Sequence, residues 1–362
     1  MKKKTALLLA AALAVSALAG CSSGGKKETA APAASEAKTE ASGGAEAGDK
    51  KEDSAPSGEK VVLRIGHGNT ADYPVSEALA VFAEKVDEYS QGTIEVQVFN
   101  DGQLGEEKDC IEGVKLGTME MARVNCGNMA SFINELNAFS LPFIFRDQDH
   151  YWNVLNGEVG TFFKDKFEAS GYKLLTFYDE GARYIYNKDG FVTKPEDLDG
   201  VKIRTMGAQS IQDGFKALGA SATPMNFGEV YTSLQQGVID AAENNYASLY
   251  TSKQYEVAPY LTDTAHLRIP GVLIMNLKLW NGLSDQQKEI LQKAADESCD
   301  YCTVRFTEKE EEFRQMIIDD GAQFQALTSE ERDAFSQLCQ PVFEQYKDIV
   351  GSGIVEKIIE TK

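Results

Sequence analysis

The sequence contains few of the side chains on which catalytic and metal sites most often depend. Only three histidines occur in 362 residues, and His67, His150 and His266 do not have the spacing of a zinc site. A phosphate-binding glycine loop and a Gly-x-Ser-x-Gly nucleophile motif are also absent. We therefore expect no catalysis, no metal and no cofactor.

Positive charge is scarce as well. The chain has 36 lysines and arginines against 56 aspartates and glutamates, a formal net charge of −20. Such a surface repels phosphate backbones and anionic lipids, which argues against nucleic acid or a charged membrane surface as a partner. It does not argue against an anionic ligand, because a buried site sets its own local field.

The apolar run near the N-terminus, Ala6–Leu18, is too short for a membrane-spanning helix, which needs about 20 residues. Three lysines precede it and Leu18-Ala19-Gly20-Cys21 ends it, a pattern typical of a secretory signal peptide over residues 1–20. These last four residues resemble a bacterial lipobox, in which the cysteine is lipidated. We expect Cys21 to anchor the protein to the membrane, and an ordinary signal peptide with an incidental cysteine is the alternative.

The segment after Cys21 lacks aromatic and large aliphatic side chains up to residue 58. It cannot bury enough apolar surface to offset its chain entropy, so we expect a disordered linker over residues 21–58. The rest of the chain, roughly 300 residues, is long enough for two domains of ordinary size.

Five cysteines remain besides Cys21, an odd number that predicts no complete disulfide framework. Cys299 and Cys302 have the spacing of a redox or metal pair, but they lie in a helical pattern, where residues three apart share one face. Small buried side chains or an incidental disulfide are the alternatives.

Alternating and helical patterns predict an α/β fold. Val61–Ile65 and Ile94–Val98 alternate like strands, and Leu79–Tyr89 between them has apolar residues at helical spacing. This β-α-β order favours a largely parallel sheet. Further strands are expected at Lys173–Phe177, Arg183–Tyr186, Val201–Thr205 and Gly271–Met275.

The last quarter of the chain is predicted to be helical. Ser284 and Gln287 have capping-box spacing, and no Gly or Pro follows until Gly321, so one helix of about 50 Å could cross two domains. Thr328 and Glu331 open a second helix, in which we expect a kink at Pro341.

Arg204 is the strongest candidate for a binding residue. It ends the predicted strand Val201–Thr205, on the face opposite the apolar residues, just before a helix. Ligands of open α/β sheets bind beyond the carboxyl ends of strands, and a helix N-terminus there favours an anion. A guanidinium in that place can hold a carboxylate with two parallel hydrogen bonds. A structural ion pair on the sheet face is the alternative.

Two weaker candidates follow from strand ends. Arg183 begins a predicted strand after a turn, and taken alone it is interpreted as an exposed arginine. Asn244 and Asn245 follow an apolar run, where paired amides can form a turn or donate to ligand hydroxyls.

Several stretches resemble the solute-binding proteins of tripartite ATP-independent periplasmic (TRAP) transporters. The likeness covers residues 60–362, and its most specific parts are Gly200–Arg204, Ala217–Ala220, Thr223–Tyr231 and Leu234–Asn244, with Gln103–Glu107 and Leu116–Met121 as a second match. The resemblance implies two α/β lobes joined by crossing strands, a ligand cleft between the lobes, and a long helix spanning both. It places lobe I at 59–180 plus 270–308 and lobe II at 181–269 plus 309–362.

The resemblance also implies a ligand set. Arg204 is expected to form a bidentate salt bridge with the ligand carboxylate. Arg183 is expected to approach the same carboxylate, and Asn244 is expected to lie in the site. Phe227 is expected to form a wall of the cleft, although plain core is an alternative. The remaining expected ligand residues are Glu107, Asn125, His67 and Asn245.

The implied function is capture of an organic acid outside the cytoplasm and its delivery to an ion-driven TRAP permease, without chemistry. The local sequences around Asn125, Arg183 and Asn244 most resemble those of family members that bind sugar acids, so glucuronate or galacturonate is the leading expectation. A keto sugar acid, sialic acid or a C4-dicarboxylate are alternatives. We expect a lipid-anchored monomer, and a secreted α/β enzyme is the competing interpretation, because a fold does not decide function.

Overall fold

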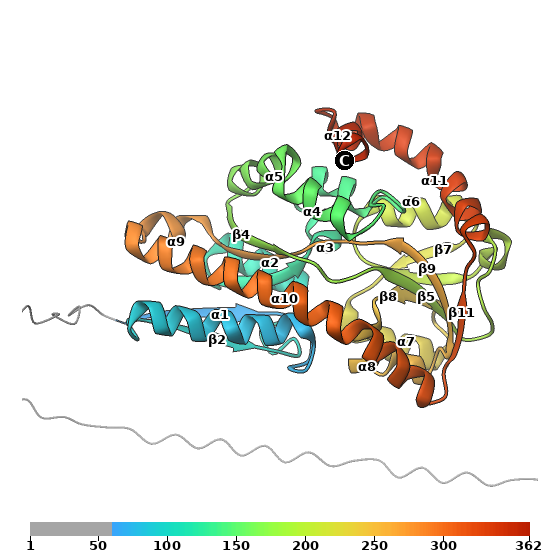
Figure 1. The fold of residues 1–362 in the computed structure, drawn as a ribbon, viewed down its shortest axis with the longest axis horizontal. Helices are drawn as coiled ribbons and strands as arrows, with labels where there is room; N and C mark the ends of the chain where they lie inside the picture. The colour runs from blue at the N-terminus through green and yellow to red at the C-terminus, as the bar shows by residue number, and fades with distance from the viewer. Residues whose placement is uncertain (1–59) are drawn as a thin grey trace, which may run out of the picture. The chain divides into compact units, whose positions relative to one another are not determined.

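The computed structural model describes residues 60–362 (Figure 1). The predicted signal peptide, Cys21 and the predicted linker lie outside the described residues. Within 60–362, none of the helices combines the length and the apolar character that crossing a bilayer requires.

The first of two sheets has five strands in the order β2-β1-β3-β10-β4. Its strands are β1 (Val61–Gly66), β2 (Ile94–Phe99), β3 (Met121–Asn125), β4 (Tyr172–Tyr178) and β10 (Gly271–Asn276). β1 runs parallel to β2 and β3, as the β-α-β pattern predicts. β10 runs antiparallel to β3 and β4.

The second sheet has six strands in the order β11-β9-β5-β8-β6-β7. They are β5 (Arg183–Asn187), β6 (Lys202–Thr205), β7 (Ser221–Pro224), β8 (Ala241–Asn244), β9 (Tyr260–Leu267) and β11 (Gln323–Ala326). β6 pairs in parallel with β7 and β8, and β5 is antiparallel to β8 and β9.

The prediction of a largely parallel sheet is therefore wrong in part. β4 leads directly into β5 of the other sheet, and β9 leads back into β10. β4 carries the chain out of the first sheet and β10 carries it back, so β10 runs in the direction opposite to β4 and β3 beside it. The two crossings make the molecule two-lobed and set the mixed strand directions.

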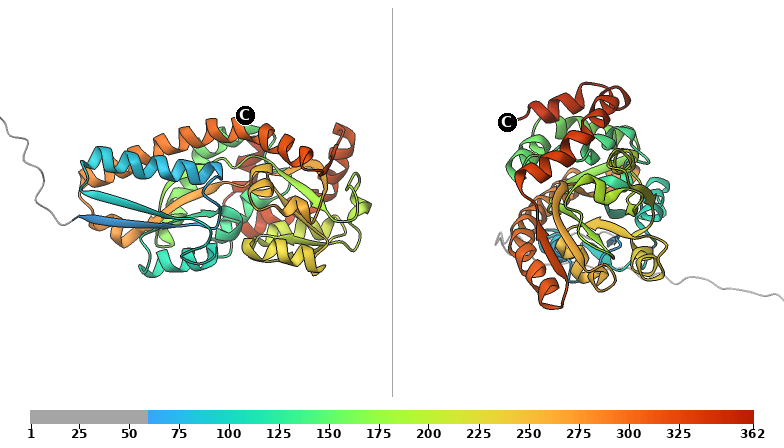
Figure 2. Two further views of the ribbon diagram at one scale, coloured as in Figure 1. Left: turned by 90° about the horizontal axis from the view of Figure 1, so that it is seen from below. Right: turned by 90° about the vertical axis from the view of Figure 1, so that its right-hand side faces the viewer.

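Helices cover both faces of each sheet. α1 (Pro74–Ser90) and α10 (Asp285–Asp319) lie side by side on one face of the first sheet, and α2 (Glu107–Leu116) and α5 (Glu158–Ala169) pack on the other (Figures 1 and 2). The remaining α-helices are α3 (Cys126–Met129), α4 (Gln148–Asn156), α6 (Gln209–Ala217), α7 (Val230–Gln236), α8 (Tyr246–Thr251), α9 (Leu277–Gly282), α11 (Ser329–Val350) and α12 (Ile354–Glu360). Four 3-10 helices are η1 (Asn134–Ser140), η2 (Pro195–Leu198), η3 (Phe227–Glu229) and η4 (Gln254–Glu256).

α10 spans both lobes, as predicted. Ser284 caps it in a capping box with Gln287, and the helix has 35 residues, or about 52 Å. It contacts α1 and β4 in the first lobe and α8 in the second. Phe306 packs against the ring of Tyr73, so one buried aromatic residue of α10 is held by the first lobe next to the cleft.

The C-terminal helices lie over both lobes. Thr328 and Glu331 form the predicted capping box of α11, which continues through Pro341. α11 contacts α6 and η1, and α12 contacts α5 (Figure 1). The division of the chain into lobes at residues 180, 269 and 308 stays a proposal.

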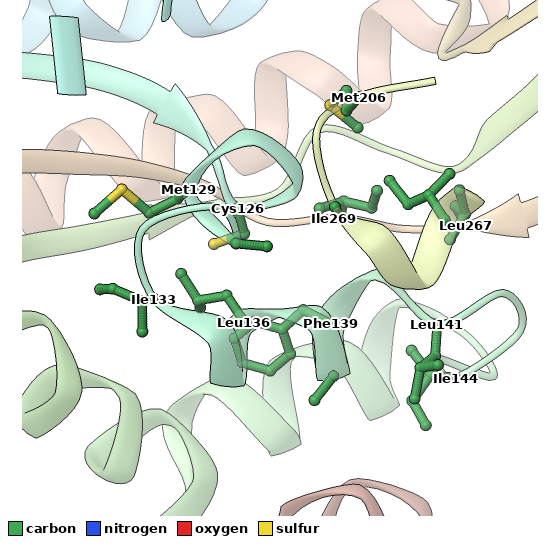
Figure 3. Packing of buried hydrophobic residues seen from close by; sticks show 14 of the residues in the cluster. Cys126, Met129, Ile133, Leu136, Phe139, Leu141, Ile144, Met206, Leu267 and Ile269 are labelled. Atoms are coloured by element: carbon green, nitrogen blue, oxygen red, sulfur yellow. The ribbon is translucent and has the colours of Figure 1, made fainter. Parts of the chain in front are cut away.

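Two buried apolar clusters support the sheets from opposite sides. In Figure 3, Met206 from the segment after β6 lies with Cys126 and Met129 of α3 in one of these clusters. All five cysteines of the described part are free thiols, so Cys299 and Cys302 form no disulfide. Cys302 is fully buried, and burial raises the pKa of Cys299 to about 11, which fits small structural side chains rather than a redox pair.

Candidate functional site

A cavity of about 440 Å³ is lined by residues from both sheets and both lobes. The first lobe contributes side chains from the ends of β3 and β4 and the starts of α1 and α2, and the second contributes side chains from β5, β6, η3 and β8. Six of the eight predicted ligand residues line it: Arg204, Arg183, Asn244, Asn125, Glu107 and Phe227.

Arg204 lies on β6 with 2% of its surface exposed. Its Nε and Nη2 atoms donate to the carbonyl oxygen of Met225, at 3.0 and 2.8 Å. Within residues 60–362 no carboxylate comes within salt-bridge distance of it, so the predicted alternative of a structural ion pair is wrong. Burial lowers the pKa of Arg204, and the nearby Glu243 offsets this effect only in part.

Arg183, at the start of β5, is buried and not exposed. It forms an ion pair with Glu243 of β8. Its Nη2 donates to the Glu243 carbonyl at 2.8 Å and to Oε1 at 3.0 Å, and its Nη1 donates to Oδ1 of Asn244 at 2.8 Å. Glu243 is inaccessible to solvent. The guanidinium is thus fixed on the cavity wall with most of its hydrogens committed.

Asn244 and Asn125, two of the three predicted asparagines, are oriented by hydrogen bonds to their neighbours. Asn244 Oδ1 accepts from Arg183 Nη1 and from the backbone N–H of Asn245. The NH₂ group of Asn244 therefore points away from these two donors. Asn125 caps α3 by accepting from Gly127 N at 2.8 Å, and its Nδ2 lies 3.3 Å from Glu180. Both side chains are therefore held as amide donors at the cavity wall.

Glu107 and Phe227 lie on the cavity wall at the start of α2 and η3. Glu107 Oε2 accepts from Asn125 N at 3.1 Å and from Asn128 Nδ2 at 2.7 Å. Phe227 is half-buried and is not part of either core cluster, so the plain-core alternative does not fit.

His67 and Asn245 do not line the cavity, unlike the other predicted residues. The His67 ring bonds Asn100 Oδ1 through Nε2 at 2.7 Å, and its Nδ1 accepts from Asn69 N at 3.3 Å. Asn245 caps α8 by accepting from Ser248 N at 2.7 Å. Both residues are buried and support their neighbours on the wall, because their own side chains turn into the protein.

Sequence reasoning missed the most densely bonded cluster of the site. Arg123 of β3 forms a buried ion pair with Glu180, which follows β4, and donates to Asn69 Oδ1 at 2.7 Å. Tyr73 lies at the same place, with its hydroxyl 3.5 Å from Glu180. A signal for Arg123 was present, since residues two apart on a strand share a face and Asn125 was a candidate.

The charges in this cluster perturb one another. Burial alone lowers the pKa of Arg123, but Glu180, Tyr73 and Glu107 outweigh it and raise the pKa. Burial raises the pKa of Glu180, which Arg123 opposes. Burial and the charge of Arg123 lower the pKa of His67 to about 4, so this imidazole is neutral near pH 7.

Polar contacts also join the two lobes across the cavity. Asn128 Oδ1 of α3 accepts from Gly207 N, in the segment after β6, at 3.0 Å. Asn245 Nδ2 donates to the hydroxyl of Tyr73 at 3.1 Å. The cavity is therefore bounded by side chains from both lobes, and hydrogen bonds join the lobes beside it.

The sequence model of a family described as bacterial extracellular solute-binding protein, family 7, matches residues 65–348. A solute-binding protein of Chromohalobacter salexigens is 35% identical over 274 residues, covering 76% of this chain and 81% of the relative. A C4-dicarboxylate-binding periplasmic protein of Rhodobacter capsulatus is 31% identical over 302 residues, covering 83% and 90%.

Solved structures give the same result. A TRAP periplasmic solute-binding protein from a Sulfitobacter species, with bound β-D-galacturonate, is 33% identical with a TM-score of 0.78, covering 83% of this chain and 98% of that one. Another from Roseobacter denitrificans, with bound β-D-glucuronate, is 32% identical with a TM-score of 0.80, covering 83% and 100%.

Proposed function

The chain belongs to family 7 of the bacterial extracellular solute-binding proteins, which serve transport, and we propose that its ligand is a sugar acid, with a hexuronate as the leading candidate. The observation that carries this proposal is Arg204. A buried guanidinium without a carboxylate partner among the described residues is costly unless an anion pairs with it. The cavity around it accommodates a molecule of that size.

The remaining wall suits hydroxyl groups better than apolar groups. Asn125 and Asn244 offer amide donors, and Glu107 offers a carboxylate acceptor at the start of α2. Phe227 supplies one apolar surface, against which the face of a sugar ring can pack. We assign the ligand carboxylate to Arg204, with Arg183 beside it, and the ring hydroxyls to the other three polar residues. His67 and Asn245 position that wall from behind.

Two similar proteins have galacturonate and glucuronate bound, which supports a hexuronate over other acids. The similarity to a C4-dicarboxylate-binding protein gives the alternative ligand class: a short acid with two carboxylates and few hydroxyls. These two ligand classes differ in charge, so one measurement separates them.

We further propose that lipidated Cys21 holds the protein at the outer face of the membrane, that the protein acts as a monomer, and that it delivers its ligand to the membrane subunits of a TRAP permease. The proposal for Cys21 rests on the Leu18-Ala19-Gly20-Cys21 pattern. The proposal for the permease rests on family membership.

A thermal-shift screen against organic acids, followed by calorimetry, tests the ligand proposal. A ligand that binds only the folded state stabilises it by RT ln(1 + [L]/Kd), which is about 2.7 kcal/mol at a hundredfold excess over Kd. Glucuronate or galacturonate should raise the melting temperature more than succinate, and neutral glucose should not raise it. A screen in which no sugar acid shifts the melting temperature would refute the proposal.

A further inference from the structure

We propose that the cleft is electrically polarised so that it accepts one carboxylate and rejects a second, and that the Arg123–Glu180 ion pair determines this selectivity. The inference rests on the proposed function, because it concerns the same cavity. It adds the reason why a polyhydroxy monocarboxylate is preferred to a dicarboxylate.

The first lobe brings an excess of negative charge. Arg123 is its one buried guanidinium at the cavity, and it pairs with Glu180 and lies 3.5 Å from Glu107. These three side chains are 3%, 6% and 15% exposed. Two carboxylates thus share one buried cation. The same wall also carries Glu106 and the exposed Lys108, so its five charged side chains sum to one negative charge in excess.

The second lobe brings an excess of positive charge. Arg183 and Arg204 both line the cavity, and the buried Glu243 behind them neutralises Arg183. Arg204 is then the buried cation at the cavity for which the described residues supply no carboxylate. The cleft therefore offers a place for one negative charge, on the side of β6.

A ligand whose first carboxylate binds Arg204 turns its other end toward Glu107 and Glu180. A second carboxylate at that end meets two carboxylates, and like charges brought together across an interface weaken binding. A hydroxyl at the same end can donate to a glutamate and accept from Arg123 or Asn125 at once. The ion pair thus suits neutral hydroxyls and disfavours an anion.

The pair cannot swing aside to admit a second anion. Glu180 is also bonded by Asn125 Nδ2 at 3.3 Å and faces the Tyr73 hydroxyl at 3.5 Å. Beneath it lies Gly271, where an added Cβ would come within 1.7 Å of Glu180 Oε1. The backbone of β10 at this glycine leaves room for the carboxylate and fixes its position over Arg123.

Gluconate and glucarate provide a matched pair of probes. They share one carbon skeleton and differ in that the terminal hydroxymethyl group of gluconate is a carboxylate in glucarate. Calorimetry should show that the wild-type protein binds glucarate at least about tenfold more weakly than gluconate. Glu180→Gln keeps the shape but removes one of the two carboxylates that share Arg123, so this ratio should fall by about tenfold or more.

Glu229→Gln is the matched control, because Glu229 also lines the cavity but is exposed and forms no ion pair among the described residues. In this control the ratio of the gluconate affinity to the glucarate affinity should stay within about twofold of the wild-type ratio, since solvent screens the charge of Glu229. If Glu180→Gln does not fold, Glu107→Gln tests the same charge excess, and the ratio should fall in that variant too.

The possible outcomes separate the two proposals. If neither sugar acids nor dicarboxylates bind, the proposed function is wrong. If gluconate and glucarate bind the wild-type protein equally, or if the ratio is unchanged in both Glu180→Gln and Glu107→Gln, the polarised cleft is wrong while the function as an organic-acid binder stands.

Discussion

Arg204 donates two hydrogen bonds to a single acceptor, the carbonyl oxygen of Met225, from Nε at 3.0 Å and from Nη2 at 2.8 Å. This carbonyl fixes the plane of the guanidinium but supplies no full negative charge. The free hydrogens of Nη1 and Nη2 form a fork that matches a carboxylate. The backbone thus holds the guanidinium in one orientation, which would lower the entropy cost of binding the proposed ligand carboxylate.

Replacing Arg204 should separate ligand affinity from stability. Arg204→Met should weaken sugar-acid binding by about a thousandfold or more, because the ligand carboxylate loses its partner. The same change should raise the melting temperature of the ligand-free protein, since it removes a buried charge without a carboxylate partner. Calorimetry and thermal unfolding measure the two effects.

Arg204→Lys is the control for charge. It should recover only part of the lost affinity, because one ammonium cannot reproduce the planar fork. An unchanged affinity in Arg204→Met would overturn the assignment of the carboxylate to this residue.

The buried pair Arg183–Glu243 should be far more important for stability than an exposed pair of similar geometry. Glu243→Gln leaves Arg183 buried and without its counter-charge, which should cost about 3–5 kcal/mol in the free energy of unfolding. Arg64–Glu120 is also bonded through two nitrogens, at 2.7 and 2.9 Å, but is partly exposed. Glu120→Gln should therefore cost about 1 kcal/mol or less. Urea unfolding of both variants checks this, and equal losses would contradict it.

Stability should fall as the pH is lowered through the range of histidine titration. Burial lowers the pKa of all three histidines, to about 4 for His67 and about 3 for His266, below the unfolded value of about 6.5. The unfolded chain takes up these protons first, so the stabilisation is present above pH 6.5 and is lost as the pH falls toward 4 and 3. Each histidine contributes a slope of up to about 1.4 kcal/mol per pH unit.

His67→Gln isolates one of these contributions. Urea unfolding of this variant between pH 7 and pH 5 should show a shallower loss of stability than in the wild-type protein. The carboxyl groups are common to both proteins and cancel in the comparison. Identical slopes would mean that His67 is protonated equally in the folded and unfolded states.

Membrane attachment should depend on one atom, the sulfur of Cys21. Expressed in a bacterial host, the wild-type protein should fractionate with membranes, and mass spectrometry should find a lipid on its N-terminal peptide. Cys21→Ser should remain unlipidated and appear in the soluble fraction. A wild-type protein with an unmodified mature N-terminus would rule out the anchor.

Local sequence patterns were sufficient for the elements whose ends depend on neighbouring residues. Ser284 with Gln287 and Thr328 with Glu331 satisfy backbone donors within one helical turn, so the starts of α10 and α11 could be predicted from the sequence. Arg204 was found because its strand is followed at once by a helix, and that order places its side chain at the ligand edge of a sheet.

Resemblance to a known family added residues that no local pattern identifies. Phe227, Glu107 and Asn125 were expected on the cleft for that reason, and all three line the cavity. His67 and Asn245 were expected there too, but which way a side chain turns at a strand end depends on partners elsewhere, here Asn100 and Tyr73.

By itself, the sequence determined the α/β class, the long bridging helix and the place of Arg204 at the end of its strand, because each depends on residues a few positions apart. The direction of β10 and the Arg123–Glu180 pair were decided only by the tertiary structure. The partners in that pair are 57 positions apart and meet because β3 and β4 flank β10, where Gly271 leaves room for a carboxylate. No spacing in the chain records such a contact, since it exists only when the returning strand has closed the sheet.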